Sequence, residues 1–414
     1  MLRSSAAKLL LFLSFVLKFL PMPIDQIELY DLRLPLAEPF IISGGKMVER
    51  RSLVLVLQDE EGRRGYGESP PFELPFYSEE TLASARYILE QVLIPRLLEN
   101  RGNSPEAVDE IIRRGVRGNP FARAALETAA WDLEAARREV GLAQLLAERL
   151  GVESASSVPC GVAVGIPQDR SLDTLRRWIG NAMAQGYRRI KIKVAPGWDV
   201  AAIRASAEVM SGSGLPLTVD ANGAYGWPEH ASELRAMDQF DLLYFEQPLA
   251  PEELLGHVRL TRELRTPICV DETLRDASAA GQIVELDGPR IWNVKVHRVG
   301  GLGEVCRIYR IAQRFGAKLW AGTMPESGLG SQAALAAAAL PGFSYPSDLE
   351  PSARWFGGGG DVIQLAMDSR GRMAVPSISI DGQLDRERFQ ASTRLLRSWS
   401  GPALTVPRTG RKLS

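Results

Sequence analysis

The sequence predicts an α/β fold: a modified (β/α)-barrel of about seven βα units and a final strand, joined to an α+β capping domain. Two observations predict the barrel. After Val158, short apolar runs alternate with amphipathic helical stretches, which is typical of βα units and a parallel sheet. An ionisable residue also stands at or near the end of five successive runs, at intervals of 27, 26, 25 and 24 positions. These residues are Lys193, Asp220, Glu246, Asp271 and Lys295.

A barrel accounts for these five residues better than a doubly wound sheet does. The carboxyl ends of all barrel strands meet at one rim, so side chains spread over about a hundred positions converge there. A doubly wound sheet gathers its functional groups mainly at one switch point. It also usually carries a Gly-rich phosphate loop after its first strand, and this sequence has none.

The chain before the barrel predicts an α+β block. Residues 24–58 contain strand-like runs, including the alternating "RSLVLVLQD". Helices follow, and Ser78 is expected to cap the first of them. Asn119 and Pro120 are expected to provide the cap and the first turn of a long helix, "FARAALETAAWDLEAARREV".

An apolar extension, residues 1–23, precedes this block. Arg3 and Lys8 come before an apolar run that imitates a signal peptide, but the run is too short to span a bilayer and lacks small residues spaced for cleavage. We interpret it as a non-native or disordered extension, with Met22 as an alternative start. The predicted domains are the capping domain at 24–155, the barrel at 156–348, a segment returning to the capping domain at 349–403 and a basic tail at 404–414.

Composition excludes several classes of protein. The 49 basic and 50 acidic residues nearly cancel, so nothing indicates nucleic acid or an anionic membrane as a partner. Cys160, Cys269 and Cys306 lack C-x-x-C spacing, which disfavours a disulfide framework and favours a reducing, cytoplasmic compartment. The three histidines lack metal-binding spacing, so any metal would have oxygen ligands.

Three carboxylates aimed at one point call for a cation. Asp220, Glu246 and Asp271 would repel each other in a dry site and should not all stay ionised without one. Carboxylate oxygens with a few waters suit Mg²⁺, which leaves positions open for a substrate carboxylate. A single carboxylate at such a junction could equally be a helix cap, but three in step disfavour that interpretation.

Lys193 and Lys295 are then expected on opposite sides of the barrel mouth, with the metal ligands between them. A poorly solvated lysine near a cation has its pKa lowered, so its neutral amine can act as a base. The cation would stabilise an enediolate formed when a carboxylate loses its α-proton. The implied chemistry is proton abstraction next to a carboxylate. Purely structural salt bridges are disfavoured, since barrel interiors are normally packed with branched apolar residues.

Several motifs, in order, resemble the enolase superfamily and its muconate-lactonising subgroup. They are "KIK" at Lys191, "VDAN" at Asp220, "EQP" at Glu246, "DE" at Asp271 and "KVHRVGG" at Lys295. The pattern is most similar to o-succinylbenzoate synthases and N-acylamino acid racemases. The resemblance spans nearly all of residues 24–400, including "GYGES" and "MPESGLGSQ".

The resemblance implies a role for each residue of the site. Asp220, Glu246 and Asp271 would bind Mg²⁺, with Mn²⁺ or another divalent ion as a substitute, and no organic cofactor is expected. Lys193 would be the base and Lys295 would face it across the substrate. Residues expected to support the substrate or metal are Lys191, Asn222, Arg298, Glu326 and Ser327. Two loops of the capping domain, 38–47 and 69–78, would form an apolar lid.

Two activities share this constellation and the motifs do not separate them. The first is an o-succinylbenzoate synthase-type lyase of menaquinone biosynthesis, which removes an α-proton and then expels a β-hydroxyl. The second is an N-succinylamino acid racemase, which needs both lysines, and Arg298 makes promiscuity credible. A dipeptide epimerase is disfavoured because Asp348-Leu349-Glu350 replaces the Asp-x-Asp expected there.

Two further classes are weighed against these. The mandelate-racemase branch needs a His-Asp base, and no histidine lies near "LWAGTMPES". A non-catalytic binding protein should have lost part of the set of two lysines and three carboxylates. The expected partner is a small-molecule carboxylate substrate, without nucleic acid or a membrane span, in a homo-oligomer.

Overall fold

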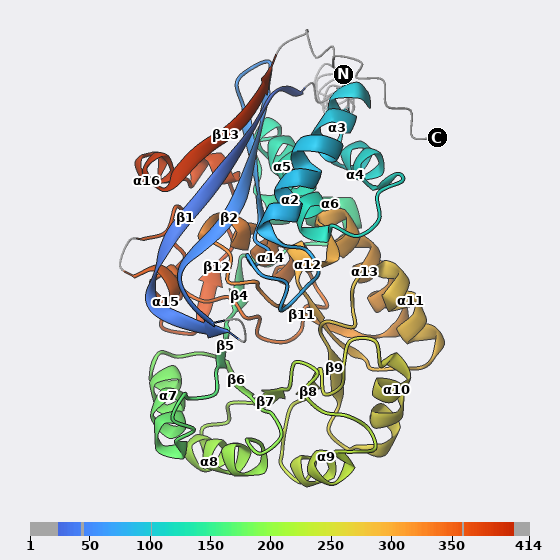
Figure 1. Cartoon of the computed structure of the whole chain (residues 1–414), viewed down its shortest axis with the longest axis vertical. Helices are drawn as coiled ribbons and strands as arrows, with labels where there is room; N and C mark the ends of the chain where they lie inside the picture. Colours follow the sequence, from blue (N-terminus) through green and yellow to red (C-terminus); the bar gives the residue numbers. More distant parts are fainter. Residues whose placement is uncertain (1–23, 43–44, 101, 358–359, 401–414) are drawn as a thin grey trace, which may run out of the picture.

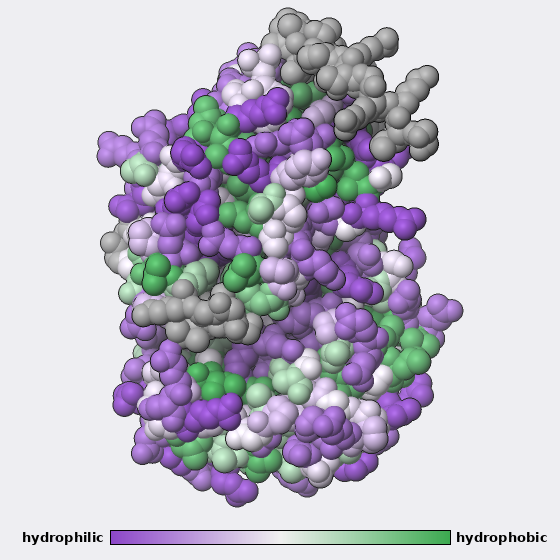
Figure 2. All heavy atoms as spheres, in the orientation of Figure 1, coloured by the Kyte–Doolittle hydropathy of each residue, from purple (hydrophilic) through white to green (hydrophobic). Residues whose placement is uncertain are grey.

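A computed structural model describes residues 24–42, 45–100, 102–357 and 360–400 (Figure 1). The predicted N-terminal extension and basic tail lie outside the described residues. Within the described part of the chain, no helix is long and apolar enough to cross a membrane. Figure 2 shows that hydrophilic residues cover most of the face in view, with apolar residues in small, scattered groups.

A four-stranded antiparallel sheet forms one end of the molecule. Its order is β13 (Thr393–Ser400), β1 (Ile24–Ile42), β2 (Gly45–Asp59) and β3 (Arg64–Ser69). Both faces of β2 are buried from Ser52 to Leu57: Leu53, Leu55 and Leu57 pack with the helices that follow, and Val54 and Val56 pack with the C-terminal segment. The alternation seen in the sequence therefore separates two cores, not a core from solvent.

Helices cover one face of this sheet. They are α2 (Leu82–Ile88), η1 (Leu89–Leu93), α3 (Ile94–Asn100), α4 (Pro105–Arg113) and α5 (Pro120–Arg137). The next helix, α6 (Leu142–Leu150), packs with the barrel core instead. Helix α5 packs directly on β3, where a Cβ atom on Gly67 would collide with the backbone of Ala125. "GYGES" therefore uses glycine for close approach between strand and helix.

The ends of two helices differ from the sequence prediction. Ser78 as the cap of α2 was wrong, because Thr81 is the cap and exchanges hydrogen bonds with Ser84. Asn119 is the N-cap residue of α5, but its side chain makes no cap hydrogen bond. The buried carboxylate of Glu80 accepts from the backbone N–H groups of Phe121 and Ala122 instead, at 2.8 and 2.9 Å.

Seven parallel strands in chain order form the barrel sheet, which confirms the predicted fold class. They are β5 (Gly161–Val164), β6 (Arg189–Lys193), β7 (Leu217–Asp220), β8 (Phe245–Glu246), β9 (Ile268–Val270), β10 (Ile291–Val294) and β11 (Lys318–Ala321). The main helices between and after them are α7 (Leu172–Ala184), α8 (Val200–Met210), α9 (Ala231–Met237), α10 (Leu254–Glu263), α11 (Ala277–Glu285), α13 (Leu302–Phe315) and α14 (Gly328–Ala338). The single turn α12 (Val296–Val299) lies between β10 and α13.

A short extended segment completes the circuit between β11 and β5. Isolated parallel bridges join Leu319 to Phe343 and Cys160 to Ser347. The Gly161 N–H donates to the Ser347 carbonyl at 2.7 Å. The predicted final strand thus exists as a bridge and not as a long strand.

The rest of the chain runs back to the capping sheet. It forms α15 (Ser352–Phe356), then β12 (Arg372–Ala374), which pairs with β4 (Ser157–Pro159), and then η2 (Ile380–Gly382) and α16 (Arg386–Ser392). Strand β13 then pairs antiparallel with β1, so the two ends of the described chain lie side by side (Figure 1).

Candidate active site

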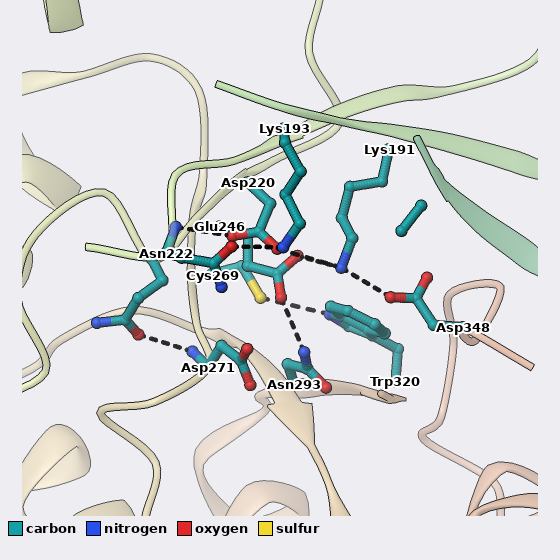
Figure 3. Close-up of polar contacts among 12 residues, drawn as sticks. Lys191, Lys193, Asp220, Asn222, Glu246, Cys269, Asp271, Asn293, Trp320 and Asp348 are labelled. Atoms are coloured by element: carbon teal, nitrogen blue, oxygen red, sulfur yellow. Dashed lines mark hydrogen bonds and ion pairs between the residues drawn. The ribbon is translucent and has the colours of Figure 1, made fainter. Parts of the chain in front are cut away.

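The C-terminal ends of neighbouring barrel strands bring the predicted residues together, and Figure 3 shows Lys193, Asp220, Glu246 and Asp271 among them. Lys193 on β6 is in register with Asp220 on β7, and Asp220 is in register with Glu246 on β8. Asp271 directly follows β9, and Lys295 directly follows β10. The strand order therefore sets the carboxylates between the two lysines, as the spacing predicts.

Asp220 is a buried carboxylate held by two lysines. Its Oδ2 atom lies 2.7 Å from Lys193 Nζ and 3.5 Å from Lys191 Nζ, and its Oδ1 accepts from the Asn222 N–H at 2.9 Å. Burial raises the pKa of Asp220, but the charges of Lys193 and Lys191 outweigh burial and hold it below the ordinary value.

Glu246 is fully buried, and its pKa shifts in the opposite direction to that of Asp220. Lys191 Nζ lies 2.9 Å from its Oε2, and the Asn293 amide donates to its Oε1 at 2.8 Å. Burial, followed by the negative charge of Asp220, raises the pKa of Glu246 to about 8. Carboxylates close enough to perturb each other in this way are the arrangement that a cation relieves.

Asp271 is paired with cations from the next strand. Lys295 Nζ lies 2.8 Å from its Oδ2, and the Arg298 guanidinium contacts its Oδ1. The Asp271 N–H donates to the Gln247 side chain at 2.9 Å. Burial raises the pKa of Asp271, but the charges of Arg298 and Lys295 outweigh it and place the pKa well below the ordinary value.

The three carboxylates fit a hard divalent cation by the chemistry of their donor atoms. All three are buried oxygen donors at one rim, which suits Mg²⁺. Across the described residues, however, no three His, Cys, Asp or Glu side chains are already arranged as a metal site. Ammonium groups of Lys191, Lys193 and Lys295 contact the carboxylate oxygens and balance their charge.

The two lysines differ in environment. The side chain of Lys193 is 32% exposed, and its ammonium group also donates to the Asn222 side chain. The side chain of Lys295 is 11% exposed, and its ammonium group donates to the Tyr77 hydroxyl at 2.8 Å. Burial lowers the pKa of Lys295, but the charge of Asp271 outweighs it and places the pKa above the ordinary value. This differs from the lowered pKa that the sequence predicts, because a carboxylate is the nearest charge.

Of the predicted supporting residues, Lys191, Asn222 and Arg298 touch the central cluster. Lys191 Nζ also lies 2.7 Å from Asp348 Oδ2, so this ammonium group contacts both Asp348 and Glu246. The Asn222 amide donates to Glu272 at 2.9 Å, and its backbone has a φ of +43°. Arg298 donates to the Tyr77 hydroxyl at 3.4 Å and to the Asn293 carbonyl at 2.9 Å.

Glu326 and Ser327 lie further round the rim, at the start of α14. The Ser327 hydroxyl donates to Glu68 of β3, and the carboxylate of Glu326 accepts from the Met324 N–H. Glu326 and Asp348 line a cavity of about 20 Å³, which is room for about one water molecule. None of the described hydrogen bonds joins Glu326 or Ser327 to the three carboxylates.

Sequence reasoning missed four polar residues around the site. Asn293 could have been found, because it shares a strand face with Lys295 just as Lys191 does with Lys193. Tyr77 and Glu68 come from the capping domain, and no local pattern connects either of them to a barrel strand. Asp348 was weighed only as a ligand for a peptide amino group, whereas it pairs with Lys191 and Arg189.

Comparisons with known proteins agree with this geometry. The family model "Mandelate racemase / muconate lactonizing enzyme, N-terminal domain" matches residues 26–147, and "Enolase C-terminal domain-like" matches residues 174–379. An N-succinylamino acid racemase from Thermus thermophilus is 42% identical over 86% of this chain and 93% of its own. An o-succinylbenzoate synthase from Enterococcus faecalis is 37% identical over 81% of this chain and 88% of its own.

Solved structures give the same result. An enolase-superfamily member from Listeria innocua superposes with a TM-score of 0.83 at 32% identity, over 91% of this chain and 98% of its own. The matched segments cover both the capping helices and the barrel strands that carry the lysines and carboxylates. The chain therefore belongs to the enolase superfamily, within the group that contains the o-succinylbenzoate synthases and the N-succinylamino acid racemases.

Proposed function

We propose that this enzyme is an o-succinylbenzoate synthase-type lyase that abstracts the proton α to a carboxylate and then eliminates water. The observation that carries the proposal is the placement of Lys193 and Lys295 on either side of three buried carboxylates at the strand ends. Names of relatives at 37% identity support the reaction class. A role in menaquinone biosynthesis would be tested by the neighbouring genes.

We infer that Asp220, Glu246 and Asp271 hold Mg²⁺, the ion that enolase-superfamily sites use with a lysine or histidine base. When bound, the ion would neutralise these carboxylates, lower the pKa of the nearby lysines and stabilise the enediolate. The other roles belong to the chain itself. Lys191 balances the charge of Glu246, and Asn222 orients the ammonium group of Lys193.

Lys193 serves the synthase reaction twice. Its neutral amine takes the α-proton, and the electron pair left behind becomes the enediolate. When the bond between the β-carbon and its hydroxyl breaks, the same ammonium returns a proton to the departing oxygen, so the leaving group is water. Lys295 stays protonated and stabilises the enediolate charge from the opposite side.

N-succinylamino acid racemisation is the second proposed activity. It requires an acid and a base on opposite faces of the α-carbon, which Lys295 and Lys193 supply. The relatives named as racemases, at 42% and 37% identity, favour it. The same site would then serve both reactions.

Two alternatives receive less support. A dipeptide epimerase must bind a free ammonium group, but Asp348 is paired with Arg189 and Lys191, and Glu350 lies 2.6 Å from Arg354. A non-catalytic binding protein leaves the buried lysine and carboxylate pairs unexplained, because burying charges is costly unless they have a task.

An assay with both substrates tests the proposal. Purified protein with Mg²⁺ should consume the synthase substrate, followed by its absorbance, and should wash deuterium into the α-carbon of N-succinyl amino acids. Chelation should abolish both reactions, and Mn²⁺ should restore part of them. If neither reaction occurs and Mg²⁺ leaves the melting temperature unchanged, the protein is a non-catalytic binding protein and the proposed enzymatic function is wrong.

We also propose that segments 38–47 and 69–78 cover the bound substrate. Support comes from Tyr77, whose hydroxyl reaches Lys295 from the second segment. In the first segment β1 and β2 continue as a hairpin, pairing Phe40 with Met47. The predicted domain boundaries at 155, 348 and 403, a reducing cytoplasmic location and assembly into a homo-oligomer remain proposals. Three buried free cysteines support the location.

A further inference from the structure

The backbone that carries Lys295 is a single helical turn between two larger elements. Lys295 is the N-cap residue of α12, and its carbonyl accepts from the Val299 N–H at 3.0 Å. Gly300 and Gly301 then lead directly into α13. A one-turn helix has little stability of its own, so its position depends on what fixes its two ends. Strand β10 fixes the first end.

The second end is fixed by a carboxylate from the capping domain. Glu127 on α5 is fully buried, and it accepts from the Leu302 N–H at 2.7 Å and from the Gly303 N–H at 2.6 Å. Its third donor is the indole N–H of Trp131, at 2.5 Å. These contacts satisfy the first free N–H groups of α13.

Glycines at the start of α13 allow the Glu127 carboxylate to approach the backbone closely. Gly301 has a φ of +114°, and a Cβ atom there would collide with the Glu127 carboxylate. A Cβ atom on Gly303 would lie 2.9 Å from Glu127 Oε1. Neighbouring Gly300 passes equally close to Arg123 of α5, at 2.9 Å from a Cβ to its guanidinium. At Gly300, Gly301 and Gly303 the backbone thus runs against α5 with no room for a side chain.

We propose that Glu127 is a positioning residue for the Lys295 half of the active site. By fixing the start of α13 it holds α12, and with it Lys295 and Arg298, against Asp271. It does not touch the reacting atoms, and it makes no described contact with the Lys193 half. This inference rests on the proposed function, and it predicts that the capping domain tunes one face of the substrate and not the other.

A matched control lies on the same helix. Asp132 is also fully buried and also accepts two backbone N–H groups, from Tyr66 at 3.0 Å and from Ile380 at 2.9 Å. Its partners belong to the capping sheet and the C-terminal segment, not to α12 or α13. Losing either carboxylate should cost similar stability, so Asp132→Asn reports what general destabilisation alone does to activity.

The experiment compares Glu127→Gln with Asp132→Asn in the full chain with Mg²⁺. The readout is deuterium exchange from each enantiomer of one N-succinyl amino acid, with Lys193→Ala and Lys295→Ala identifying which enantiomer reports on which lysine. Glu127→Gln should slow exchange at the Lys295 face by about 10- to 100-fold, because small misplacements of reacting groups are costly. Exchange at the Lys193 face should stay within about 3-fold, and Asp132→Asn should leave the ratio of the two faces unchanged.

Gly303→Ala provides a second variant if Glu127→Gln does not fold, since it displaces the carboxylate without removing it. Equal losses at both faces, no loss at either, or the same ratio change in Asp132→Asn would overturn the inference. Absence of exchange in the unaltered protein would instead overturn the proposed function, so the two failures are distinct.

Discussion

The two lysines of the site are built in different ways. Lys193 lies on a barrel strand, and its partners Asp220 and Asn222 come from the next strand and its loop. Lys295 lies on a single helical turn, and its ammonium group contacts Asp271 of the barrel and Tyr77 of the capping domain. One half of the site is therefore complete within the barrel, while the other depends on contacts across the chain.

This difference suggests that the barrel and the capping domain contribute differently to the two reactions. Lys193 is held by a barrel strand and by partners from the barrel, so we expect its position to be independent of the capping domain. A lysine whose turn is fixed by another part of the fold can respond to closure over the substrate. Synthase chemistry, which asks only Lys193 for proton transfer, should be the more robust of the two activities.

The largest effect is expected at Lys193. Lys193→Ala removes the only proposed base of the synthase reaction, so both synthase turnover and racemisation should fall by about 10²- to 10⁴-fold. Steady-state kinetics with each substrate measure this loss. Lys318→Ala, an exposed lysine at the start of β11, is the matched control and should be silent. Retained synthase turnover in the Lys193 variant would reassign the base.

Lys295→Ala should separate the activities. Racemisation should fall by a similar factor, about 10²- to 10⁴-fold, because one face loses its acid or base. Synthase turnover should fall less, by about 10²-fold, through lost electrostatic stabilisation. Deuterium exchange of the enantiomer facing Lys193 should persist. Unaltered racemisation would remove Lys295 from the mechanism.

At acidic pH, protonation of His257 should lower the free energy of unfolding. This buried imidazole contacts the Glu253 carbonyl with Nδ1 at 2.8 Å and accepts from the Leu249 N–H with Nε2 at 3.3 Å, just after Glu246. Burial lowers its pKa to about 4. Between that value and the ordinary pKa of about 6.5, the unfolded chain binds more protons, so stability should fall as the pH falls. The full effect is about 3 kcal/mol.

Urea unfolding at several pH values checks this prediction. His257→Gln replaces the titrating imidazole with an amide that does not titrate, so the free energy of unfolding of this variant should depend less on pH over this window. Identical pH profiles for the unaltered protein and His257→Gln would contradict the assignment.

The smallest effect is expected from Tyr77→Phe. This change removes one hydroxyl contact to Lys295 and keeps the ring, whose centroid lies 4.9 Å from the ammonium group. A single hydrogen bond is worth about 1 kcal/mol, so racemisation should slow by about 5-fold and synthase turnover should hardly change. Tyr87→Phe, at an exposed position of α2, is the control. An equal loss in both reactions would show that the lid contact is not specific to Lys295.

The same contrast explains what the sequence could predict. The barrel and the placement of Lys193, Asp220 and Glu246 follow from strand periodicity and from the regular spacing of βα units, which are local properties. The contacts of Tyr77, Glu68 and Glu127 with barrel segments join residues separated by 175 positions or more. No periodic pattern encodes such pairs, because only the packing of the capping domain on the barrel brings them together.

Misassigned caps have a similar cause. Ser78 has the right chemistry to start a helix, but the backbone begins its helical turn only after Thr81. Glu80, two residues beyond Ser78, is used to cap a different helix, α5. Local preference identified a capping region, and tertiary packing decided which side chain capped which helix.

The pairing of β13 with β1 has a consequence for biosynthesis. Among the strands of residues 24–400, the one that forms this edge of the capping sheet is the last to be translated, and its partner is the first. All the barrel strands leave the ribosome before that edge can form. A nascent chain therefore exposes the flank of β1 until Ser400 has emerged, and a chain released early would carry an open, aggregation-prone strand.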